Sequence, residues 1–169
     1  MKTFEFSIVA SGLDPLAEDF EARFYDAGCD DALVSFQKGH VIVDFAREAE
    51  SIDEAIGSAL EAVGRAGATV ERVEPDPLVN LSEIAARAGL SRAAVSLYAK
   101  GERGRDFPPP VACVTSVSPL WDWSSVAGWL VGRGQLGPEA WTEALTVSRI
   151  NLSLTIAKTA GERKAGRLA

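Results

Sequence analysis

The residues of this chain best suited to binding chemistry are small and basic side chains gathered between positions 92 and 100. They are Arg92, Ala93, Ser96 and Lys100. Arginine and lysine bind guanine edges and phosphates, serine bonds to either, and alanine contacts a thymine methyl group. These residue types predict contact with double-stranded DNA, provided that a helix presents them on one face.

The residues that could support catalysis are few. His40 is the single histidine, and Cys29 and Cys113 are the only cysteines. These counts exclude a multi-histidine metal site, a Cys-x-x-Cys site and a disulfide framework. The carboxylates of residues 14–76 form no recognisable acid–base pair, so we interpret them as a solvated acidic face, with a chelated divalent cation as the alternative. The sequence predicts no enzyme, no catalytic residues, no cofactor and no metal site.

Two further patterns suggest other ligands. Residues 132–137 match the Gly-x-Gly-x-x-Gly pattern of dinucleotide sites, but they follow a predicted helix and precede Pro138, so a loop is favoured. The four tryptophans could stack on bases, although their apolar surroundings favour packing in the core. They are Trp121, Trp123, Trp129 and Trp141.

The net charge of −7 hides a change of sign along the chain. Residues 1–77 contain 17 acidic and 6 basic residues, a net charge of −11, whereas residues 78–169 contain 7 acidic and 11 basic residues, a net charge of +4. This asymmetry predicts two units with different partners. No apolar run reaches the ~18 residues of a membrane span, so we expect no membrane contact and a reduced, cytoplasmic protein.

The first half alternates between strand and helix patterns. Apolar residues at every second position predict strands over residues 3–9, 32–36 and 41–45. A shorter last strand is expected over residues 68–73, where Val70 and Val73 do not alternate. One helix is expected to begin at Asp14 and Pro15 and to end near Gly28, and a second to lie between a Ser51 cap and Gly67. This βαββαβ order predicts the α+β class, with a ferredoxin-like domain over residues 1–74 that dimerises or, alternatively, senses a ligand.

The second half begins, after a proline-rich linker at residues 74–77, with the pattern of a helix-turn-helix. Ser82 is expected to cap a short helix, Gly89 to form the turn, and Ser91 to cap a second helix that ends at Gly101. Val95 and Tyr98 then face inward by the 3.6-residue period. A plain helical hairpin with a glycine turn is the alternative.

The segment after these helices predicts a wing. Residues 111–117 and 120–123 are expected to form two strands, and Ser124 to cap a helix that contains Trp129. Residues 80–131 resemble the winged helix-turn-helix of MerR-type and phage-excisionase (AlpA-type) regulators, through a Phe-Pro-Pro-Pro-Val approach to the wing and the run Leu-Trp-Asp-Trp-Ser-Ser-Val-Ala-Gly-Trp-Leu. The resemblance implies a winged helix-turn-helix domain over residues 78–131 that binds DNA through its second helix, although the wing sequence here has no basic residue. It also implies that Ser91 lies on this reading helix with Arg92, Ser96 and Lys100, and that Arg103 and Arg105 lie on the turn that leads to the wing. Residues 44–49 also resemble a run in actinobacterial-style DNA-binding proteins.

The last segment, residues 138–163, predicts a C-terminal helix. Its apolar residues spread over most of the circumference, so the helix should be buried in a core or against a partner. Together the patterns predict a sequence-specific, homodimeric DNA-binding transcriptional regulator. The alternative is an antitoxin or adaptor whose acidic N-terminal domain binds a protein partner.

Overall fold

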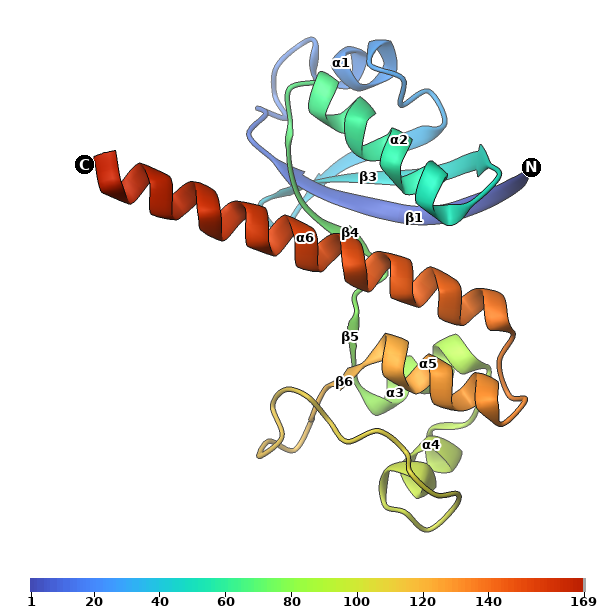
Figure 1. Ribbon diagram of the computed structural model, residues 1–169. Helices are drawn as coiled ribbons and strands as arrows, with labels where there is room; N and C mark the ends of the chain where they lie inside the picture. Colours follow the sequence, from blue (N-terminus) through green and yellow to red (C-terminus); the bar gives the residue numbers. More distant parts are fainter. Residues whose placement is uncertain (169) are drawn as a thin grey trace. The chain divides into compact units, whose positions relative to one another are not determined.

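The structure is a computed structural model that describes residues 1–168, and it confirms the predicted mixed α+β class (Figure 1). The chain divides into two compact units. The first, here called the sheet unit, comprises Met1–Pro75 and the chain from Arg149 onward, and the second, the helical unit, comprises Asp76–Ser148. None of the helices in the described residues combines the length and hydrophobicity that crossing a membrane requires.

The sheet unit is built on four antiparallel strands. They are β1 (Lys2–Ser11), β2 (Ala32–Gln37), β3 (His40–Ala49) and β4 (Thr69–Glu74), in the order β2-β3-β1-β4. Helices α1 (Phe20–Asp26) and α2 (Ile52–Arg65) cover one face of this sheet (Figure 1). The core lies between them, where Phe6 and Phe45 stack at 5.3 Å between ring centroids and α2 buries Ile56 and Val63.

The sheet unit differs from the prediction at the start of α1 and explains the irregular pattern of β4. Helix α1 begins at Phe20 instead of Asp14, because the Asp14 carboxylate accepts a hydrogen bond from the Leu16 N–H at 2.9 Å and closes a local turn. Leu16, in the segment predicted to be helical, is 89% exposed and lies outside α1. In β4, the register against β1 shifts beside Val9, which leaves Glu71 as an extra residue and explains why the apolar residues there do not alternate.

The helical unit contains short elements around one core. They are β5 (Leu78–Val79), α3 (Leu81–Ala88), α4 (Arg92–Ala99), β6 (Trp121–Asp122), α5 (Trp123–Gly132) and the beginning of α6 (Pro138–Leu168). The fully buried side chains of this core include Val79, Ile84, Val95, Val126 and Leu130.

Ser91 caps α4 as predicted, whereas two other helices of this unit have different caps from those predicted. Asn80 caps α3 in place of Ser82, because Asn80 and Glu83 bond reciprocally to each other's backbone N–H groups. Asp122 caps α5 in place of Ser124, because its carboxylate accepts a hydrogen bond from the Ser125 N–H at 3.0 Å.

The predicted two-stranded wing is largely wrong. Residues 111–117 form no strand, and a single bridge joins Ala112 to Leu120 at the base of a loop. Cys113 has a φ of 51°, a left-handed conformation that ends strand geometry at that residue. β6, the remnant of the predicted return strand, pairs with β5 instead, and Trp123 already begins α5.

Helix α6 is longer and more exposed than predicted. It runs to Leu168, not to residue 163, and contributes to both units. Leu152 and Ile156 are 62% and 61% exposed, so the described chain does not bury this helix all round. Within the sheet unit, the Asn151 amide lies against the edge strand β4, where it accepts from the Val73 N–H and donates to the Val73 carbonyl, each at 2.8 Å.

Candidate nucleic-acid interface

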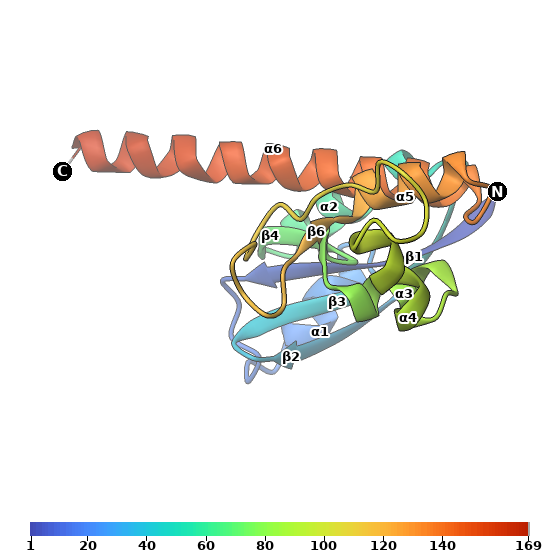
Figure 2. The same cartoon turned by 90° about the horizontal axis from the view of Figure 1, so that it is seen from below.

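The two helices α3 and α4 meet in a tight corner (Figure 2). Gly89 ends α3 with a φ of 65°, the left-handed conformation that glycine adopts without steric cost. The Leu90 N–H then donates to the Ala85 carbonyl at 2.9 Å, and the Ser91 hydroxyl accepts from the Ala94 N–H at 3.1 Å to start α4. Because these bonds fix the turn, α4 presents a defined face outward.

The outward face of α4 carries the residues that the sequence singled out. Val95 and Tyr98 are buried, as predicted. The structure leaves Ser91, Arg92, Ala93 and Lys100 exposed, and Ser96 half-buried. Five of the seven predicted site residues therefore belong to α4 or directly flank it. The face combines small side chains, which permit close approach to a surface, with one cation near each end of the helix.

Arg103 and Arg105 lie in the turn after α4, and both are exposed. The Arg103 N–H bonds back to the Leu97 carbonyl at 3.2 Å, and the Trp129 indole donates to the Arg105 carbonyl at 2.9 Å. Gly104, between the two arginines, passes so close to Trp129 that a Cβ would come within 3.0 Å of its ring. The turn is thus held against the core of the helical unit while its two cations face outward.

Aromatic residues support this turn from beneath. Trp129 packs edge-on against Tyr98 and Phe107 at 4.9 and 5.1 Å, and the Arg133 guanidinium lies 4.7 Å above its ring. Trp121 and Trp123 are buried, which confirms packing over base stacking for those two. The sequence did not identify Arg133, because its contact depends on Trp129 of the preceding turn and on Tyr98 of α4.

The charge of the folded helical unit differs from that of the second half of the sequence. Residues 76–148 contain seven acidic and six basic residues, so the unit is nearly neutral at −1. The remaining positive charge of the second half lies on the part of α6 that belongs to the sheet unit. There Arg149 pairs with Asp53, and Lys158 with Glu71. The candidate interface nevertheless carries a local concentration of positive charge, because four of the unit's six basic residues fall within residues 92–105.

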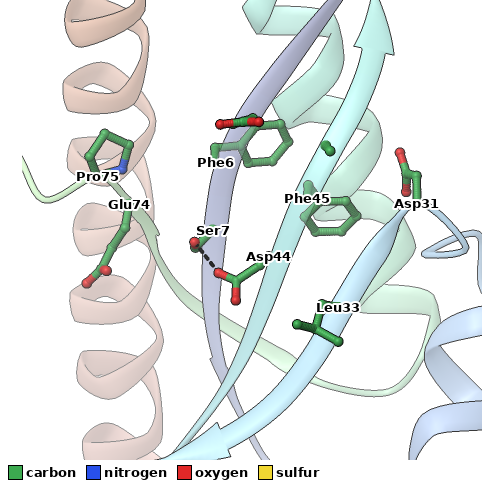
Figure 3. Close-up of a pocket in the computed structure, with 10 residues that line it drawn as sticks. Phe6, Ser7, Asp31, Leu33, Asp44, Phe45, Glu74 and Pro75 are labelled. Atoms are coloured by element: carbon green, nitrogen blue, oxygen red, sulfur yellow. Dashed lines mark hydrogen bonds between the residues drawn. The ribbon is translucent and has the colours of Figure 1, made fainter.

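A second candidate site is an open hollow of about 680 Å³ on the sheet unit (Figure 3). Glu74, Ser7, Asp44 and Leu33 lie in one row across the four strands, and the Ser7 hydroxyl donates to the Asp44 carboxylate. At the rim, the Arg47 guanidinium contacts the Asp31 carboxylate at 2.7 Å and lowers the pKa of that group by hydrogen bonding. The row therefore presents carboxylates beside apolar surface.

The residues that could act as nucleophile or base lie apart from both sites. Cys29 is buried, and burial raises the pKa of its thiol, which reduces its reactivity. His40 is exposed at the start of β3, and Cys113 is exposed in the loop of residues 112–120. Within the part of the chain that the structure describes, the two cysteines and His40 therefore form no nucleophile–base pair at the α4 surface.

Comparisons with protein-family models, curated proteins and solved structures give no match for this chain. The chemistry of the α4 surface follows from its donors. Exposed guanidinium and ammonium groups bind phosphates and guanine edges, while hydroxyl groups bond to either. These donor types suit an anionic ligand that accepts hydrogen bonds.

Proposed function

We propose that this protein is a sequence-specific DNA-binding transcriptional regulator that acts as a homodimer. One observation carries the proposal: α3 and α4 meet at a left-handed Gly89, bury Val95 and Tyr98, and leave Arg92 and Lys100 on an outward face. This arrangement supports a helix-turn-helix assignment, in which the second helix enters the major groove. The antiparallel order β2-β3-β1-β4 supports a ferredoxin-like assignment for the sheet unit.

In the proposed complex, α4 reads base edges and its flanks hold the backbone. Ala93 and Ser96 allow the helix to approach the floor of the groove, and Ser96 can donate to or accept from a base. Lys100, Arg103 and Arg105 follow the helix and neutralise phosphates. The 112–120 loop takes the place of the wing. It has no cation, so it contributes hydrogen bonds through serine side chains instead of charge.

The proposal is tested by measuring how the full-length protein binds a random pool of duplexes about 30 base pairs long, which can hold two half-sites. We expect a sequence to be enriched and its affinity to fall steeply with salt, because phosphate contacts release counterions. A triple variant, Lys100→Gln with Arg103→Gln and Arg105→Gln, should weaken binding by about 1 kcal/mol or more per lost contact.

The matched control removes three charges elsewhere, through Arg163→Gln, Lys164→Gln and Arg167→Gln near the end of α6. This control should retain the sequence preference. If both triple variants lose the same affinity and no sequence is enriched, DNA binding is a general property of exposed cations and the helix-turn-helix assignment is wrong.

A second candidate function is favoured by the hollow on the sheet unit. Glu5, Asp44 and Glu74 line it together with the apolar Leu33, which suits a basic protein partner of an adaptor or antitoxin. Affinity capture with wild-type protein and with an Asp44→Asn, Glu74→Gln variant distinguishes this candidate. A partner that depends on these carboxylates, combined with no enriched DNA sequence, would favour the adaptor.

A further inference from the structure

A small polar hollow lies where α3, α4 and the 112–120 loop approach one another in the helical unit. It encloses about 90 Å³ and is lined by Asn80, Leu81, Ser82, Arg92, Val117, Ser118 and Pro119. That volume has room for several water molecules, and therefore for a single phosphate group. Three separate segments of the chain build the hollow, so it depends on the folded unit.

The hollow holds an anchored cation. The Arg92 Nε–H donates to the Ser82 hydroxyl at 3.1 Å, which fixes the guanidinium beside the first turn of α3. Among the described residues, no carboxylate forms an ion pair with Arg92, so the other N–H groups of its fork remain available. Because the Ser82 oxygen accepts from Arg92, its own O–H can donate to a ligand.

Further donors come from the backbone and the loop. The N–H groups of Leu81 and Ser82 belong to the first turn of α3 and have no acceptor within the helix. The Glu83 carboxylate, the nearest acidic group of that turn, accepts from the Asn80 N–H at 2.8 Å and does not line the hollow. Ser118 adds a hydroxyl on the opposite side. A guanidinium, two hydroxyls and helix N–H groups form a set of donors that matches a phosphate anion.

We propose that this hollow is a phosphate-binding site that holds one phosphodiester of the DNA backbone, with Arg92 as a phosphate ligand and not a reader of bases. The proposal rests on the proposed function, because the DNA supplies the phosphate. Arg92 is also the first residue of α4, so a phosphate in the hollow lies at the start of the helix whose later residues, Ala93 and Ser96, face the groove in the proposed complex. The contact thereby sets the register of α4 on the duplex.

The test uses full-length Arg92→Gln and Ser82→Ala variants on the enriched duplex and on the random pool. For Arg92→Gln we expect about a tenfold loss of affinity, similar on both DNAs, and a salt slope shallower by about one unit. Arg92→Lys keeps the charge but loses the fork, so the salt slope should stay while affinity falls. Arg65→Gln, an exposed arginine on α2, is the control and should change neither quantity.

A neutral methylphosphonate, placed at each position of the enriched duplex in turn, identifies the phosphate. One position should weaken wild-type binding but leave Arg92→Gln unaffected. If Arg92→Gln instead changes the preferred sequence and keeps the salt slope, Arg92 reads a base, and this proposal is wrong while the proposed function stands.

If the wild type binds no duplex, the proposed function fails, and so does the proposal that the hollow holds a phosphate of the DNA backbone. A titration with inorganic phosphate then decides what the hollow binds. Saturable shifts of the Leu81 and Ser82 amide signals that Arg92→Gln abolishes would assign the site to a free anion, and unchanged signals would show that it binds no phosphate.

Discussion

Asp31 and Arg47 make a two-point contact in the sheet unit, with Nε–Oδ2 and Nη2–Oδ1 distances of 2.7 and 2.8 Å. The Arg47 side chain is only 12% exposed, and it also donates to the Gly28 carbonyl at 2.6 Å. The Arg47 hydrogen bond lowers the pKa of Asp31, and the same bond raises the pKa of Arg47. The pair therefore ties the loop before β2 to β3.

We expect Asp31→Asn to lower the free energy of unfolding at pH 7 by about 1.5–3 kcal/mol, the range for a hydrogen bond to a charged group. A carboxyl whose pKa is lowered by folding stabilises the fold above its unfolded pKa of about 3.9, and this stabilisation is lost as the pH falls through the folded pKa. Urea unfolding at pH 7, 5 and 3 should show the difference from wild type shrinking at the lowest pH. The exposed neighbour Asp30 is the control, and an equal effect of Asp30→Asn would contradict the account.

Two glycines of α5 provide a test of packing in the helical unit. A Cβ on Gly128 would lie 2.9 Å from the Trp141 ring, whereas a Cβ on Gly132 meets nothing within 4 Å. Gly128→Ala should therefore destabilise the protein by about 1–3 kcal/mol through overpacking, while Gly132→Ala should be neutral or stabilising, since alanine favours helix. Thermal unfolding checks both. Equal melting temperatures for the two variants would show that Trp141 can move aside.

At the scale of helices and strands, the sequence predicted the structure best where local patterns agree with tertiary contacts. Period-2 alternation placed β1, β2 and β3 of the sheet unit, and the Gly89–Ser91 corner followed from turn and cap chemistry. The wing failed because Trp121 and Asp122 pair with β5, a partner of only two residues that precedes α3 and has no periodicity to reveal it. The caps of α3 and α5 shifted because several residues in each stretch can cap, and at α3 the reciprocal bond between Asn80 and Glu83 selects Asn80.

The Asn151 side chain occupies the outer edge of β4 as another strand would, by bonding to both backbone groups of Val73. We expect Asn151→Leu to cost about 1–3 kcal/mol, because it leaves a buried donor and acceptor unpaired, and to speed hydrogen exchange of the Val73 amide. Ser153→Ala, two residues along the exposed side of α6, should change neither quantity. If Asn151→Leu keeps the wild-type exchange rate at Val73, the amide is protected by another part of the sheet unit.

At the scale of the whole molecule, the two halves of the sequence do not coincide with the two folded units. The sequence placed a charge boundary near residue 77, but α6 returns four surplus positive charges to the sheet unit. No single-sequence pattern could show this, because the contacts of Asn151 with Val73 and Lys158 with Glu71 span about 80 residues. A fragment that begins at residue 78 would remove α6 from these partners, so the full chain is the proper material for DNA binding.

The same helix supplies the surface through which we expect two copies to associate. The open sheet face is acidic, with Glu5, Asp44 and Glu48 exposed, so two such faces repel each other. Leu152 and Ile156, one turn apart on α6, are instead large, apolar and more than 60% exposed. Pairing of these residues between copies removes apolar area from water.

We therefore expect light scattering to report twice 17.9 kDa for the wild type and 17.9 kDa for Leu152→Glu with Ile156→Glu. The control, Ser153→Glu with Ala157→Glu, adds the same charges at the same spacing but is rotated by about 100° around the helix, so it should remain dimeric. Because one helix-turn-helix unit reads only a few base pairs, the monomeric variant should lose affinity for a two-half-site duplex while keeping its affinity for a single half-site. A wild type that stays monomeric at micromolar concentration, or a control that dissociates as readily as the Leu152 variant, would contradict this assignment of the dimer contact.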